Sequence, residues 1–192
     1  MITLEKYSLK YVDDFVEFLK EFQQYSDEFN MLGIIEEIHN SYFKVSKSYK
    51  DFTEEEIREF FPRYVEFMLN CEKKETIEKK GWVEAESYFI CKDGKMIGEL
   101  MFRKRLNPYL LTNSLGHIGY KIKQSERRKG YASEALRLML EKAWNDGYTE
   151  LMVSCNENNI GSSKVIERNG GILNRLNKRD NGTVEKEYWI FK

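Results

Sequence analysis

The segment from His117 to Gly147 constrains the fold most, because it joins an apolar strand to a helix through a basic turn. Residues 117–122 read as a short strand, and Arg127–Gly130 form the turn. Gly147 supplies the C-terminal stop of the helix. The helix places small and apolar side chains on one face: Ala132, Ala135, Leu136, Met139, Leu140 and Ala143. The segment therefore predicts a helix that packs on a sheet.

The first 80 residues read mainly as helices. Residues 2–7 read as a short strand, and Asp13 begins a helix whose aromatic residues recur at helical spacing. A T-x-x-E capping box at Thr53 begins another helix, which Pro62 is expected to kink or split. No element is predicted for residues 26–50.

From Ser87 the hydrophobic period becomes that of strands, and Asp93-Gly94 is typical of a tight hairpin turn. Further along we expect a loop at Asn107-Pro108, a buried strand at 151–153, a helix at 160–168 and a hairpin turning near Asn181-Gly182. The order of elements predicts an α+β fold, an α/β sandwich in which helices flank a mixed sheet. We expect a single domain of residues 1–192, with a helical N-terminal part at 10–80.

Composition excludes several classes of protein. Lysines and arginines number 31 against 32 acidic residues, so the excess of positive charge typical of nucleic-acid binders is missing. The three cysteines are odd in number and lack CxxC spacing, which disfavours a disulfide framework and a zinc site. No apolar stretch approaches the roughly 20 residues of a membrane span, and the N-terminus lacks a signal sequence. We expect a cytoplasmic protein without membrane or nucleic-acid partners.

The basic turn is a candidate anion site. Backbone N–H groups at the start of the following helix can point at a phosphate, and Gly130 permits its close approach. The turn lacks the G-K-[ST] ending of a P-loop and the glycines of a Rossmann fingerprint, which disfavours ATP and NAD. The alternative reading is a plain solvated basic turn.

Two motifs resemble those of the GNAT superfamily of N-acetyltransferases. Arg127, Gly130 and Ala132 fill the pattern [RQ]-x-x-G-x-[GA] between a strand and a helix. Asn159 and Ser162 fill N-x-x-[AS] ahead of an apolar helix. The resemblance covers residues 81–192, and the first 80 residues match only loosely. It implies the GNAT fold, with a mostly antiparallel sheet and one strand splayed from its neighbour.

The resemblance also implies acetyl-coenzyme A as cosubstrate, with no metal. The splayed strand would hold the pantetheine arm through Tyr120, Lys121 and Ile122, and the N–H of Ile122 would polarise the thioester carbonyl. Asn159 would contact the far end of the pantetheine. The pyrophosphate would lie on the basic turn and the start of its helix, at Arg127, Arg128, Lys129, Gly130, Tyr131 and Ala132.

Candidates for proton transfer are less well defined. His117 begins the splayed strand, and its ring suits a base near neutral pH; a structural histidine is the alternative. Glu99, on the neighbouring strand, is either a base or amine anchor or an outward-facing carboxylate. By resemblance, Ser162 would lie near the leaving sulfur, or it is simply a first-turn residue of its helix. The tyrosine acid of many GNAT enzymes is replaced here by Ile166.

The resulting hypothesis is an enzyme that acetylates a primary amine of a small molecule or peptide by direct attack in a ternary complex. A non-catalytic acyl-coenzyme A sensor is the alternative, because a fold and its cofactor loop can persist without turnover. The acceptor and the oligomeric state stay open, with a homodimer among the options.

Overall fold

A computed structural model describes residues 1–24, 30–77, 82–179 and 182–192. Its seven-stranded sheet has the order β1-β2-β3-β4-β5-β7-β6. Neighbouring strands are antiparallel except β4 and β5, which are parallel. The strands are β1 (Ile2–Lys6), β2 (Ala85–Lys92), β3 (Lys95–Arg103), β4 (Ile118–Ile122), β5 (Glu150–Asn156), β6 (Ile172–Lys178) and β7 (Val184–Phe191).

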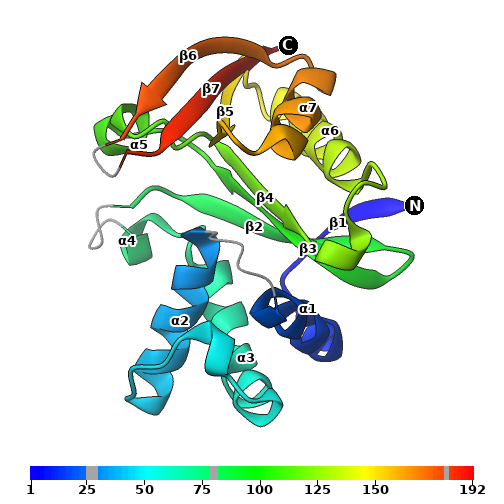
Figure 1. Ribbon diagram of the computed structural model, residues 1–192, viewed down its shortest axis with the longest axis vertical. Coiled ribbons are helices and arrows are strands. Elements are labelled where there is room, and N and C mark those ends of the chain that lie inside the picture. Colours follow the sequence, from blue (N-terminus) through cyan, green and yellow to red (C-terminus); the bar gives the residue numbers. More distant parts are fainter. Residues whose placement is uncertain (25–29, 78–81, 180–181) are drawn as a thin grey trace.

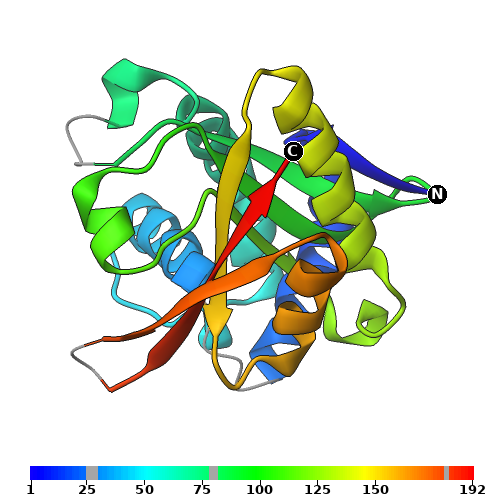
Figure 2. The same ribbon diagram turned by 90° about the horizontal axis from the view of Figure 1, so that it is seen from above.

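Helices cover both faces of this sheet (Figure 1), as the sequence predicts for an α+β sandwich. The first three helices lie on one face, and α6 and α7 lie side by side on the other (Figures 1 and 2). The helices are α1 (Val12–Gln24), α2 (Asn30–Phe43), α3 (Glu54–Asn70), α4 (Lys74–Ile77), α5 (Pro108–Thr112), α6 (Tyr131–Asn145) and α7 (Ile160–Arg168).

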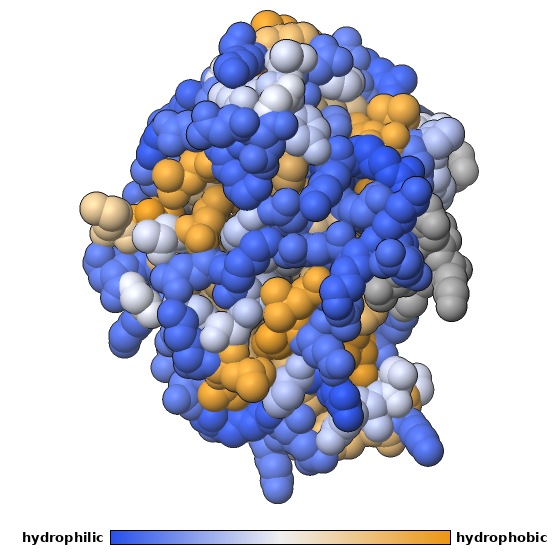
Figure 3. Space-filling model, turned by 180° about the vertical axis from the view of Figure 1, so that it is seen from behind, coloured by the Kyte–Doolittle hydropathy of each residue, from blue (hydrophilic) through white to orange (hydrophobic). Residues whose placement is uncertain are grey.

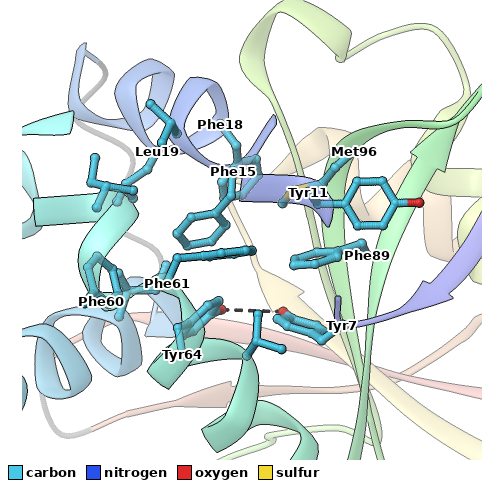
Figure 4. Close-up of a cluster of buried hydrophobic side chains, with 14 of the residues drawn as sticks. Tyr7, Tyr11, Phe15, Phe18, Leu19, Phe60, Phe61, Tyr64, Phe89 and Met96 are labelled. Atoms are coloured by element: carbon cyan, nitrogen blue, oxygen red, sulfur yellow. Dashed lines mark hydrogen bonds between the residues drawn. The ribbon is translucent and has the colours of Figure 1, made fainter. Parts of the chain in front are cut away.

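Each face of the sheet has its own hydrophobic core. The α1–α3 core is rich in aromatic rings; those of Phe15 and Phe61 pack at 4.8 Å between centroids, tilted by 37° (Figure 4). The α6–α7 core is mainly aliphatic and includes Leu136, Val153 and Ile166. On the face of the molecule in Figure 3, hydrophilic side chains predominate and hydrophobic ones gather in separate patches.

Cysteine side chains lie in both cores. Cys91 belongs to the α1–α3 core and Cys155 to the α6–α7 core. Cys71, the C-cap of α3, is also buried, and no disulfide joins these three cysteines.

The predicted hairpin at Asp93-Gly94 is confirmed. Asp93 has φ +50° and Gly94 has φ +83°, which is the pair of positive angles that a type I′ turn requires. Strands β2 and β3 pair from Ala85 with Arg103 to Lys92 with Lys95. Strands β6 and β7 form the last hairpin, and its turn contains Gly182; Asn181 lies outside the described residues.

Pro62 was expected to kink or split its helix, and the split is wrong. Helix α3 begins at the predicted capping box of Thr53 and Glu56 and continues through Pro62 to Asn70. Pro62 lies on the exposed side, where the carbonyl that loses its N–H partner can face water.

Helices α2, α4 and α5 were not predicted. Helix α2 lies within 26–50, where residues 25–29 are outside the described part of the chain. Helix α5 occupies the expected loop at Asn107-Pro108, because the Asn107 carboxamide accepts the Leu110 N–H at 2.9 Å and caps it.

Candidate active site

Strand β4 separates from β5 soon after the two strands meet. The pairing between them joins Ile118 with Val153, whereas β4 pairs with β3 over the whole run from Ile118 to Ile122. The parallel strands β4 and β5 therefore diverge and leave an opening in the sheet.

Alternation along β4 shows which of its backbone groups face this opening. The N–H of Lys123 donates to the Ile97 carbonyl of β3 at 2.8 Å, so the amides of Lys121 also face β3. The amides of Tyr120 and Ile122 consequently face the opening. The guanidinium of Arg127 donates to the Ile122 carbonyl at 3.1 Å from that side.

The basic turn ends in an uncapped helix. Gly130 has φ +84° and precedes α6 without a side-chain cap on the first N–H groups of the helix. An added Cβ at Gly130 would meet nothing within 4 Å, so the glycine is needed for its backbone conformation and not for space. Arg128 has φ +62°, a strained value for a residue with a side chain. The free N–H groups form a site for an anion.

A cleft of about 740 Å³ joins the opening of the sheet to the basic turn. Most of the predicted cofactor residues line it together: Tyr120, Lys121, Ile122, Arg127, Arg128, Gly130, Tyr131, Ala132 and Asn159. Ser162 lines it too. Lys129 does not line it; its ammonium pairs with Glu126, a lining residue, at 3.0 Å.

The start of α7 forms the far wall of the cleft. The Asn159 carboxamide oxygen accepts the Ser162 N–H at 3.0 Å and caps the helix. The phenol of Tyr120 lies buried beside Ser162: burial raises the pKa of Tyr120, and the Ser162 hydroxyl opposes this shift. The two hydroxyls are neighbours at the cleft but form no hydrogen bond with each other.

His117 lies outside the lining of this cleft. Its Nδ1 accepts the Met152 N–H at 3.0 Å, and its ring contacts those of Tyr148 and Trp189. Burial and, to a smaller extent, the charge of Arg103 lower the pKa of His117 to about 4. Because Nδ1 accepts a hydrogen bond, the neutral ring carries its proton on Nε2 and has no free lone pair for a substrate proton.

Glu99 lies inside the protein, with 0% of its side chain exposed, and it does not line the cleft. Its Oε1 accepts hydrogen bonds from Tyr7 at 2.5 Å and from Tyr64 at 2.8 Å. Its Oε2 lies 2.8 Å from the ammonium of Lys121, poorly aligned for a hydrogen bond, so this attraction is mainly Coulombic. We call these four residues the Glu99 cluster; Figure 4 shows its two tyrosines meeting.

The tyrosines of the Glu99 cluster keep their protons. Burial raises the pKa of Tyr7 and of Tyr64, and the carboxylate of Glu99 raises both further. Both phenols therefore donate to Glu99. A charged residue in the middle of strand β3, between apolar neighbours, was the sequence signal for this cluster, but nothing local indicated its partners.

Lys164 and Arg168 also line the cleft, and the sequence analysis missed them. They are four residues apart on α7, so they share a helix face, and this spacing was the available signal.

Among the described residues, no group of three or more His, Cys, Asp or Glu could hold a metal ion. No described helix is long and apolar enough to cross a membrane.

The chain matches the family model "Acetyltransferase (GNAT) domain" over residues 13–172. It is 31% identical over 80 residues to the "Uncharacterized N-acetyltransferase YjdG" of Bacillus subtilis strain 168. That stretch covers 41% of this chain and 44% of the relative, so the match spans less than half of the relative's length.

Solved structures share the fold at low sequence identity. The ribosomal L7/L12 alpha-N-protein acetyltransferase RimL in complex with coenzyme A has a TM-score of 0.67 and 18% identity, over 99% of this chain and 93% of that one. The microcin C7 self-immunity acetyltransferase MccE with acetyl-CoA and AMP has a TM-score of 0.64 and 17% identity, over 100% and 92%. Mycobacterium smegmatis RimJ in complex with CoA-disulfide has a TM-score of 0.66 and 14% identity, over 99% of this chain and 81% of that one.

Proposed function

This chain belongs to the GNAT family of acetyltransferases, and we propose that it transfers the acetyl group of acetyl-coenzyme A to a primary amine of a small molecule or peptide. One observation carries the proposal: a single cleft joins the open amides of β4 to the uncapped start of α6. Such a cleft suits an extended ligand with a diphosphate at one end and an amide-containing arm at the other.

Different residues of the cleft bind different parts of the cosubstrate in this proposal. The turn at Arg127–Ala132 and the first N–H groups of α6 take the diphosphate. The amides of Tyr120 and Ile122 pair with the pantetheine arm as a neighbouring strand would, and the Ile122 N–H polarises the thioester carbonyl. The Asn159 carboxamide oxygen already holds Ser162, which leaves its NH₂ group to donate to the arm.

Proton transfer must balance on both sides of the reaction. The attacking amine loses a proton as its nitrogen bonds to the acetyl carbon, and the thiolate gains one as the carbon–sulfur bond breaks. The Ser162 hydroxyl gives its proton to the thiolate and regains one from water, which has taken up the proton that the amine lost.

The amine proton leaves through water in this proposal. His117 has its Nδ1 lone pair engaged by Met152 and its ring proton on Nε2, and the carboxylate of Glu99 is surrounded by Tyr7, Tyr64 and Lys121. Neither residue lines the cleft. His117 and Glu99 as bases stay predictions, each of which requires one of these contacts to open.

A non-catalytic acyl-coenzyme A sensor is the second candidate, and one residue favours it. Ile166 stands where many GNAT enzymes have their tyrosine acid, and its side chain is fully buried in the α6–α7 core. No proton donor therefore comes from that position. A sensor would bind the cosubstrate as the enzyme does and would release no thiol.

Two measurements test the proposal. Coenzyme A at millimolar concentration is expected to raise the melting temperature, and Gly130→Glu is expected to remove that shift by placing bulk and negative charge at the diphosphate site. Gly147→Glu is the matched control, since Gly147 also has positive φ and open space around it, at the other end of α6. It should keep the shift.

Turnover separates the enzyme from the sensor. Thiol release from acetyl-coenzyme A is followed over a panel of amines, aminoglycosides and peptides, with the acetylated product identified by mass spectrometry. Binding without release over the whole panel would favour the sensor. Absence of binding by wild-type protein would contradict both functions.

A further inference from the structure

Two cations on α7 face the cleft beyond the basic turn. Lys164 and Arg168 lie one helical turn apart, both side chains are exposed, and both line the cleft. We call them the α7 cation pair. They repel each other at this spacing, so their placement on one face costs stability unless something compensates for it.

Neither member of the α7 cation pair has an ion-pair partner in the described part of the chain. Other helical cations are paired: Arg137 contacts Glu134 at 2.7 Å, and Lys142 contacts Asp146 at 2.6 Å. The acid between the two cations, Glu167, is turned away and accepts the Tyr188 hydroxyl at 3.0 Å. The pair is thus available to an anionic ligand.

The second half of α7 is fixed beside the start of α6. The Asn169 NH₂ group donates to the Ser133 carbonyl at 3.2 Å and to the Ser133 hydroxyl at 3.1 Å. The same group holds the Val165 carbonyl at 2.8 Å. Ser133 belongs to the first turn of α6, so the α7 cation pair adjoins the diphosphate site proposed above.

The basic turn has enough positive groups for a diphosphate without α7. Arg127, Arg128 and the first N–H groups of α6 all face that part of the cleft. The α7 cation pair therefore calls for a second anionic group close to the first. Coenzyme A carries one, the 3′-phosphate of its ribose, with about two negative charges near neutral pH.

We infer that Lys164 and Arg168 bind the 3′-phosphate of coenzyme A and make the protein selective for the free 3′-phosphorylated coenzyme. Dephospho-coenzyme A lacks this phosphate, and an acyl group on the phosphopantetheine of a carrier protein lacks the whole nucleotide. Both are consequently poor ligands. The inference rests on the proposed function, since it assigns one more group of the same cosubstrate.

The test compares the dissociation constants of coenzyme A and dephospho-coenzyme A by calorimetry for three proteins. The wild type is expected to bind coenzyme A about 100-fold more tightly. The double variant Lys164→Gln, Arg168→Gln should remove that difference. It should weaken the binding of coenzyme A about tenfold for each cation and leave the binding of dephospho-coenzyme A unchanged. Lys178→Gln, which removes an exposed charge of β6 outside the cleft, is the control and should keep the difference.

The outcomes separate this inference from the proposed function. Equal affinities of the wild type for the two ligands would overturn the inference. An equal loss of affinity for both ligands in the double variant would overturn it too, because the α7 cation pair would then bind the diphosphate or attract anions in general. In both cases the proposed function would stand, because both ligands bind. If neither ligand binds the wild type, the proposed function fails and the inference fails with it.

Discussion

Breaking the ion pair of the Glu99 cluster should destabilise the protein strongly and in a non-additive way. Glu99→Gln leaves the Lys121 ammonium, with 1% of its side chain exposed, without a counter-charge. Loss of one partner of a buried pair costs about 3–5 kcal/mol. The Phe18 and Phe22 rings near the ammonium, at 5.1 and 5.9 Å, offset only part of this cost.

Lys121→Met should cost less than Glu99→Gln. The Glu99 carboxylate then keeps two phenol donors, from Tyr7 and Tyr64, and a hydrogen bond to a charged group contributes about 1.5–3 kcal/mol. We expect a loss of about 1–3 kcal/mol. The double variant Glu99→Gln, Lys121→Met buries no charge, so it should be no less stable than Glu99→Gln alone.

Urea denaturation followed by circular dichroism gives the free energy of unfolding for all four proteins of this cycle. The expected coupling between the two substitutions is at least about 1 kcal/mol, the smallest loss expected for Lys121→Met. If the two losses add within about 0.5 kcal/mol, the ammonium and the carboxylate do not interact as described. Because Lys121 lies between Tyr120 and Ile122, a folded Lys121→Met protein should also bind coenzyme A more weakly.

Three further variants test other parts of the structure. Gly98→Ala should destabilise by about 1–3 kcal/mol and weaken coenzyme A binding, because the new Cβ would lie 2.3 Å from the Lys121 carbonyl in β4; unchanged stability in urea would contradict this. The pKa of His117 is about 4 when folded and about 6.5 when unfolded, so protonation favours unfolding. Melting temperatures should therefore fall from pH 6.5 towards pH 4 more steeply for wild type than for His117→Gln, and the opposite order would refute the assignment. Thr53→Ala removes the cap of α3 and should cost about 1 kcal/mol in chemical denaturation, whereas a neutral result would show that packing alone fixes the helix start.

Local patterns were sufficient for much of the fold. Helix α7 begins at Ile160 and ends at Arg168, as its apolar spacing and the glycines that follow it predict. Helix α2 could not be predicted in the same way, because its sequence contains Gly33 and Asn40 and its stability comes from distant contacts. Ile35 is fully buried in the α1–α3 core, and the ring of His39 stacks on Phe52 at 3.6 Å between centroids.

The candidate site divides along the same line. The basic turn and the cap at Asn159 are each formed by consecutive residues, so a sequence motif could indicate each of them. In the Glu99 cluster, Tyr7 precedes Glu99 by 92 positions and Tyr64 precedes it by 35. The geometry of the cluster therefore depends on how α3 packs on the sheet. Sequence alone could therefore name Glu99 as a carboxylate of interest and could not show that its oxygens are already engaged.

The placement of the cysteines gives each core its own chemical reporter. A thiol reacts as the thiolate. Burial raises the pKa of Cys91 to about 11, and burial also raises the pKa of Cys155. The folded protein should thus react slowly with aromatic disulfide reagents and give little background when released coenzyme A is titrated. Over longer exposure, mass spectrometry can locate each modified cysteine. Labelling at Cys91 would then record openings of the α1–α3 core, and labelling at Cys155 those of the α6–α7 core.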